Sequence, residues 1–141
     1  MNSIVVDSSM AIAWLMEDEF DETADWVLDS VKTGVRLFVP ALWMWEVTNA
    51  VFFAERRNRI NKEYRDAALD RIDLLPVTFV PLPTLEEMKS LRVYADKHRL
   101  TAYDAKYLRI AKDLDLPLAT LDRALITAAR AEGVALVDKK P

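Results

Sequence analysis

The stretch IVVDSSMAIAWL, residues 4–15, decides the fold. Residues 4–6 form an uninterrupted apolar run, which is typical of a strand buried on both faces, and residues 10–15 read as a helix. Asp7 lies at the junction between the two. Ligands of open α/β sheets bind outside the carboxyl ends of the strands, so Asp7 is either a helix N-cap or part of a site. The choice depends on whether other acids converge on the same edge.

Short apolar strands alternate with helices along the rest of the chain. Because the strands are apolar throughout, both faces of their sheet should be covered, which predicts a three-layer α/β/α fold with a mainly parallel sheet. The 141 residues fit a single domain over residues 1–141. The predicted strands are 3–6, 36–40, 77–82, 117–120 and 134–138, and the predicted helices are 11–16, 20–32, 41–58, 61–75, 84–99, 102–114 and 123–133.

The composition restricts the class of protein and the kind of metal site. The chain is 52% hydrophobic and 30% charged, which is ordinary for a globular protein. No run approaches the roughly 20 apolar residues of a membrane span, and no signal peptide is evident, so we expect a cytoplasmic protein without a membrane contact. There is no cysteine and one histidine, His98, so any metal would be held by oxygen, as Mg²⁺, Mn²⁺ or Ca²⁺ are.

Four acids interrupt apolar surfaces. Asp7 ends the first predicted strand and Asp122 follows the fourth, so both lie at the same sheet edge, about 5 Å apart if the strands are neighbours. Glu46 lies within the apolar run ALWMWEVTNAVFFA, and Asp104 lies on the inward stripe of the helix 102–114. Each has a structural alternative: a cap for a strand-end acid, a salt bridge for Glu46, and the helix dipole for Asp104.

The four acids together indicate a metal site. Crowded carboxylates raise one another's pKa, and a divalent cation removes that repulsion. Hard oxygen ligands suit Mg²⁺ or Mn²⁺, and the chemistry that follows is metal-assisted hydrolysis of a phosphodiester bond. The net charge of −4 comes from 19 basic and 23 acidic residues, so the chain without these four acids is neutral.

The same residues carry a resemblance to a known family. The chain resembles the PIN-domain nucleases, specifically the VapC-type toxins of bacterial toxin–antitoxin pairs, over nearly its whole length. The similarity rests on four motifs in order: IVVDSSMAIAWL with Asp7, WEVTNAV with Glu46 and Asn49, LTAYDAKYLRIA with Asp104, and LPLATLDRAL with Thr120 and Asp122.

The resemblance implies a fold, an activity and partners. It implies a five-stranded parallel sheet in the order 3-2-1-4-5, Mg²⁺- or Mn²⁺-dependent cleavage of RNA, a homodimer, and a cognate antitoxin that blocks the site. Asp7, Glu46, Asp104 and Asp122 would be both catalytic residues and metal ligands. Side chains that would orient these acids are Ser8, Ser9, Asn49 and Thr120, for which cap or turn hydrogen bonds remain the alternative.

Alternatives of other classes stay open at this point. The chain could be a PIN-type nuclease of RNA processing without an antitoxin, or a non-catalytic regulatory domain that binds a metal or phosphate. The basic cluster after the Glu46 helix could contact RNA or an antitoxin, or could only interact with the helix C-terminus. The candidate RNA or antitoxin contacts are Trp43, Phe53, Arg56, Arg57 and Arg59.

Overall fold

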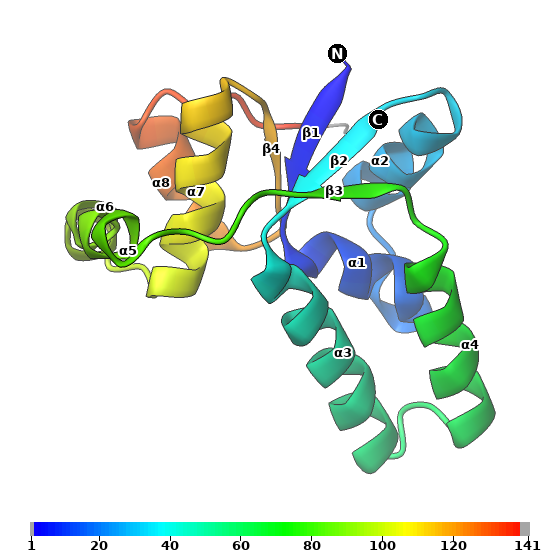
Figure 1. Ribbon diagram of the computed structural model, residues 1–141. Helices are drawn as coiled ribbons and strands as arrows, with labels where there is room; N and C mark the ends of the chain where they lie inside the picture. Colours follow the sequence, from blue (N-terminus) through cyan, green and yellow to red (C-terminus); the bar gives the residue numbers. More distant parts are fainter. Residues whose placement is uncertain (1, 139–141) are drawn as a thin grey trace.

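A twisted parallel sheet lies between two layers of helices (Figure 1). The computed structural model describes residues 2–138, so the ends of the predicted domain 1–141 lie outside the described residues. Helices α7 and α8 cover one face of the sheet, and α1, α2 and α4 lie on the other (Figure 1). The predicted three-layer α/β/α class is therefore confirmed.

The sheet has four parallel strands in the order β3-β2-β1-β4. The strands are β1 (Ser3–Val6), β2 (Arg36–Val39), β3 (Val77–Phe79) and β4 (Leu118–Ala119). The helices are α1 (Ser8–Leu15), α2 (Glu22–Lys32), α3 (Ala41–Arg56), α4 (Lys62–Asp73), α5 (Leu85–Ser90), α6 (Arg92–His98), α7 (Ala102–Leu114) and α8 (Arg123–Ala131), with a 3₁₀ turn, η1 (Glu17–Glu19).

Two predicted elements differ in the structure. The expected fifth strand is reduced to a parallel bridge between Leu118 and Leu136, supported by bonds of 2.9 Å from Leu118 N to Ala135 O and 3.0 Å from Val137 N to Leu118 O. The position next to β4 is the predicted one, but β4 is only two residues long and offers little to pair with. The helix predicted over 84–99 divides into α5 and α6 at Leu91.

The strand at the centre of the sheet is the most deeply buried element. Ile4, Val5 and Val6 have no exposed surface, because β2 and β4 flank β1 and helices cover both of its faces. Over residues 2–138, no helix is long and apolar enough to cross a membrane. Parallel order brings the carboxyl ends of β1 and β4 together, which places Asp7 and the loop after Ala119 side by side.

Helix α3 is anchored to this edge by Trp43. The Trp43 side chain is fully buried, and its indole N–H donates to the carbonyl oxygen of Asp7 at 3.3 Å. The expectation that Trp43 contacts RNA or an antitoxin is therefore wrong, because the ring has no accessible surface. Helix α3 is apolar on nearly all sides, so its periodicity alone does not show which side meets the sheet.

We expect Trp43→Ala to lower the free energy of unfolding by about 3–5 kcal/mol, because it removes a large buried ring and leaves a cavity. Trp45→Ala is the matched control, since that ring is 76% exposed and its loss should change stability by less than about 0.5 kcal/mol. Urea unfolding monitored by circular dichroism measures both. Equal effects of the two changes would contradict the anchoring role of Trp43.

Candidate metal centre

The Asp7 carboxylate is the most buried acid of the edge. It is 4% exposed and follows β1 directly. One oxygen, Oδ1, accepts the Ser9 backbone N–H at 3.1 Å and the Ser9 hydroxyl at 2.5 Å, while Oδ2 accepts the Thr120 hydroxyl. Asp7 is thus the N-cap of α1, as the structural alternative proposed. Capping does not explain the additional bond from Thr120, which follows the neighbouring strand β4.

Burial of this carboxylate changes its acidity. Desolvation raises the pKa of Asp7 from its ordinary value of 3.8 to about 6, and the negative charge of Asp104 adds to the rise. Hydrogen bonds from Ser9 and Thr120 oppose the shift, because they favour the ionised form. The charged form of Asp7 is therefore held in the protein at a free-energy cost.

Ser9 and Thr120 link the β1 and β4 ends of the sheet edge. The Ser9 hydroxyl oxygen also accepts the Leu121 N–H at 2.9 Å, and the Thr120 hydroxyl oxygen accepts the Asp122 N–H at 3.0 Å. Both side chains therefore fix the loop after β4 relative to Asp7, and both were predicted to orient the acids. Within residues 2–138, the side chains of Ser8 and Asn49 make no hydrogen bond to any of the four acids.

Glu46 reaches the same edge from α3. Its Oε1 accepts the hydroxyl of Tyr107, on α7, at 2.6 Å, and Tyr107 is almost fully buried. Partial burial raises the pKa of Glu46, the Tyr107 bond opposes the rise, and the Asp104 charge adds to it. No basic side chain among the described residues pairs with Glu46, so the predicted salt-bridge alternative does not apply there.

Tyr107 is the residue that sequence reasoning did not assign to the site. Burial first, and then its bond to Glu46, raise the pKa of the Tyr107 phenol far above its ordinary value, so it stays a neutral donor. The available signal was position: Tyr107 lies one turn after Asp104 on the inward stripe, and a buried phenol needs a partner. Its partner lies 61 positions earlier, on another helix.

Asp104 and Asp122 lie at the starts of α7 and α8. Thr101 caps α7 by accepting the Asp104 N–H at 3.1 Å, and Asp122 caps α8 by accepting the Leu125 N–H at 3.0 Å. Partial burial raises the pKa of Asp104, and the charge of Asp122 contributes, while the Thr101 side chain opposes it. The negative charge of Asp104 raises the pKa of Asp7 and of Glu46, and the negative charge of Asp122 raises the pKa of Asp104.

The chemistry of this donor set fits a hard divalent cation. All four candidates are carboxylates, and none of them forms an ion pair within the described chain. The single histidine, His98, is bound to Glu132 at 2.7 Å. Over residues 2–138, no three acidic or histidine side chains are drawn together closely enough to hold an ion as they stand. Ligation by these acids stays a prediction, and it requires side-chain movement.

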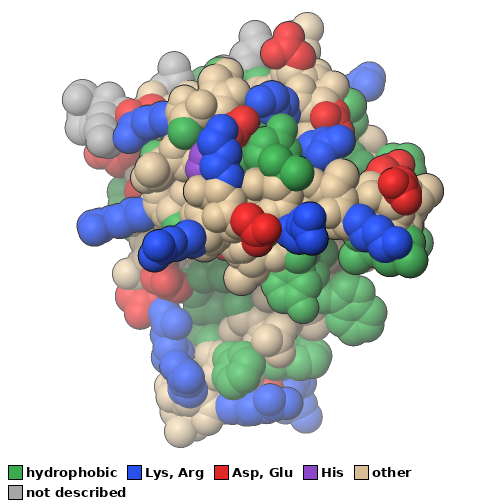
Figure 2. Space-filling view, turned by 90° about the vertical axis from the view of Figure 1, so that its left-hand side faces the viewer, with side chains coloured by type: hydrophobic (Ala, Val, Ile, Leu, Met, Phe, Trp, Pro, Cys, Tyr) green, Lys and Arg blue, Asp and Glu red, His purple; other side chains and the backbone are tan. Residues whose placement is uncertain are grey.

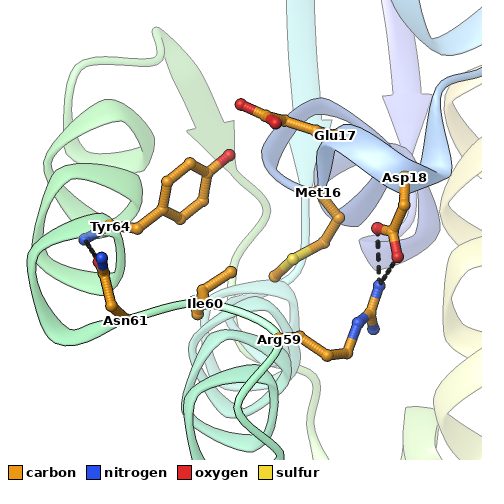
Figure 3. Close-up of a pocket in the computed structure, with 7 residues that line it drawn as sticks. All are labelled: Met16, Glu17, Asp18, Arg59, Ile60, Asn61 and Tyr64. Carbon is orange, nitrogen blue, oxygen red and sulfur yellow. Dashed lines mark hydrogen bonds and ion pairs between the residues drawn. The ribbon is translucent and has the colours of Figure 1, made fainter.

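A separate pocket lies away from the four acids, where the α3–α4 turn faces η1 (Figure 3). It has a volume of about 400 Å³ and is lined by residues that include Met16, Ile60 and Tyr64. In it, Arg59 donates to both carboxylate oxygens of Asp18, at 2.9 and 3.1 Å, and to Glu19 at 3.3 Å. These bonds hold the α3–α4 turn against η1, so the Arg59 charge is already paired.

The comparisons with known proteins agree with this fold. A family model described as PIN domain matches residues 4–131, so the chain belongs to the PIN-domain family. Within that family it is a relative of the VapC type. It is 30% identical to VapC ribonuclease Mb0985 of Mycobacterium bovis, over 92% of this chain and 93% of that protein. It is also 30% identical to Ribonuclease VapC3 of Pyrobaculum aerophilum, over 86% of this chain and 91% of that protein.

Solved structures show the same architecture. PAE2754 from Pyrobaculum aerophilum superposes with a TM-score of 0.69 at 25% identity, over 96% of this chain and 90% of that one. FitAcB from Neisseria gonorrhoeae superposes with a TM-score of 0.65 at 20% identity, over 96% of each chain, which supports the fold. The predicted family and fold class are confirmed by these matches.

We expect Asp7→Asn to stabilise the metal-free protein by about 1–3 kcal/mol at pH 8, at about 1.4 kcal/mol per pKa unit. The folded pKa lies above the unfolded one, so the wild type loses stability as pH rises from about 4 to 6, and the advantage of the variant grows over that window. Urea unfolding of both proteins at pH 4 and pH 8 in EDTA measures the difference in their free energies of unfolding. A variant less stable than the wild type at pH 8 would contradict the prediction.

Proposed function

We propose that this chain is a divalent-metal-dependent endoribonuclease that hydrolyses phosphodiester bonds in RNA. The observation that supports the proposal is that Asp7, Glu46 and Asp122 each interact electrostatically with Asp104 near one sheet edge, with no basic partner among the described residues. The names of the relatives support it, since both curated relatives described above are called ribonucleases. Mg²⁺ or Mn²⁺ is the proposed ion, because the donor set is entirely carboxylate oxygen.

The four acids would hold the ion, and the other side chains would position them. When bound, the ion supplies positive charge that lowers the pKa of an attacking water and stabilises charge developing on the phosphate. Ser9 and Thr120 fix the two oxygens of Asp7, and Tyr107 fixes one oxygen of Glu46. Asp122 is exposed and Asp104 is half-buried, so a phosphate can approach the site from their side.

We also propose binding partners for this chain and the compartment in which it acts. We propose a cognate antitoxin, as part of a type II toxin–antitoxin pair, a homodimer, and action in the cytoplasm. The similarity to VapC proteins supports the antitoxin. The exposed apolar side chains of α3, Met44 at 37% and Trp45 at 76%, support a protein contact on the side of the helix that faces away from the sheet.

We expect the chain to cleave single-stranded RNA when Mg²⁺ or Mn²⁺ is supplied, and to lose activity when EDTA is added. Asp104→Asn should lower kcat by about 100-fold or more, because it removes a charged ligand. Asp113→Asn is the matched control on α7, since Asp113 is exposed and paired with Arg109 at 3.0 Å. Gel-based cleavage of a labelled oligonucleotide measures all three proteins. Cleavage that survives both EDTA and Asp104→Asn would overturn the proposal.

Tyr107→Phe should weaken Mn²⁺ binding by about 10- to 100-fold while the protein stays folded, because Glu46 loses the donor that holds it. The ring is retained, so packing of α7 changes little. Tyr103→Phe is the control, since that side chain is on the same helix and 59% exposed. Isothermal titration with Mn²⁺ measures the affinities. If both variants bind Mn²⁺ like the wild type, Tyr107 does not position a ligand.

A further inference from the structure

The face of α3 that carries Glu46 continues beyond the acids to the end of the helix. At 100° per residue, Phe53 and Arg57 lie within about 20° of the Glu46 direction. Their rises along the axis are about 10 Å and 16 Å from Glu46. Asn49, which is exposed, lies between Glu46 and Phe53 along the axis, about 60° from the Glu46 direction. One exposed stripe therefore runs from the candidate metal centre to the C-terminal end of α3.

The far part of this stripe combines an exposed ring with two arginines that contact it. Phe53 is 45% exposed, and the guanidinium groups of Arg56 and Arg57 lie 5.8 and 5.7 Å from the centre of its ring. Within residues 2–138, neither arginine forms an ion pair, whereas Arg59 and Arg65 are each bound to carboxylates. In Figure 2 the lower end of the molecule, where Figure 1 places the far ends of α3 and α4, shows hydrophobic and basic side chains together.

Helix capping explains only part of this arrangement. A basic residue in the last turn interacts favourably with the helix dipole, which accounts for the position of Arg56. It does not account for a half-exposed ring that two guanidinium groups approach, neither of which forms an ion pair within the described residues. Exposed aromatic rings flanked by arginines are the surfaces on which single-stranded nucleic acids stack their bases and place their phosphates.

We propose that this part of α3 binds the RNA strand next to the bond that is cut, with a base stacked on Phe53 and phosphates bound by Arg56 and Arg57. The proposal rests on the proposed ribonuclease function. Four carboxylates repel a polyanion, and a chain of net charge −4 has little bulk attraction for RNA. Positive charge within about 16 Å of Glu46 supplies the local attraction that the site lacks. A rise of that size spans a few nucleotides of a strand.

The first arm of the test measures stacking. A fluorescein-labelled single-stranded RNA is titrated with the metal-free protein in EDTA, so that no cleavage occurs, and anisotropy gives the affinity. Phe53→Ala should weaken binding roughly 5- to 150-fold, the range for loss of one stacked base. Phe53→Trp should retain the affinity, and Phe53→Leu should lose it. Phe52→Ala is the matched control, since Phe52 is 39% exposed but points about 100° away.

The second arm measures phosphate contacts. The logarithm of the affinity falls with the logarithm of salt concentration, and each phosphate contact contributes about 0.7 to that slope for single strands. Arg57→Ala should reduce the slope by about that amount. Arg71→Ala is the control, because Arg71 also lies over a ring, that of Tyr64 at 5.5 Å, but on α4. Unfolding midpoints for every variant confirm that each is folded.

The outcomes separate this inference from the proposed function. If the wild type cleaves RNA but Phe53→Ala binds it as tightly as Phe52→Ala does, the RNA path is overturned, including the case in which a protein partner occupies Phe53. If Phe53→Leu binds as well as Phe53→Trp, the ring does not stack a base and the inference also fails. If Phe53 and Arg57 behave as expected but no cleavage occurs with Mg²⁺ or Mn²⁺, the binding path stands and the nuclease function falls.

Discussion

The buried carboxylate of Asp7 is the constraint on which the site depends. It lies at the end of the central strand, in a setting that raises its pKa to about 6, and no basic side chain in the described chain neutralises it. Hydrogen bonds from Ser9 and Thr120 hold both of its oxygens. The same two hydroxyls fix the loop after β4, so the position of Asp122 follows from the bonds that keep Asp7 in place.

Helix α3 connects that constraint to the surface. Its buried side carries Trp43, which bonds to the Asp7 carbonyl, and the next turn carries Glu46, which accepts a bond from α7. The helix therefore joins the two layers at the sheet edge. Beyond this junction α3 extends away from the sheet (Figure 1). Val47, Val51 and Ala54 stay buried there, whereas Phe52 and Phe53 are exposed. A single helix thus contributes a core anchor, a candidate ligand and an accessible surface in successive turns.

The strand-end acids could be predicted from the sequence, because an apolar run fixes where a strand ends and parallel pairing brings strand ends together. The hydrogen-bond partner of Glu46 could not be predicted, because Tyr107 lies 61 positions later in the chain and contacts Glu46 only through the packing of α7 near α3. Trp43 was assigned to the wrong side because α3 is apolar all round. The fifth strand was overestimated because pairing depends on β4, which has two residues. The hydrophobic pattern of the sequence predicts where helices and strands lie and where strands end. It does not predict which side chains of different elements contact one another, because that depends on how the elements pack.

The cost of burying Asp7 has an evolutionary consequence. A protein usually loses stability when a polar core residue is replaced, and that loss removes the variant from a population. If Asp7→Asn folds at least as well as the wild type, as expected above from the raised pKa of Asp7, selection for folding does not protect the acid. In that case Asp7 would persist in a lineage only while its charge is useful. An inactive descendant of this chain would then be expected to lose Asp7 early and to keep the surrounding core of Ile4, Val5 and Val6.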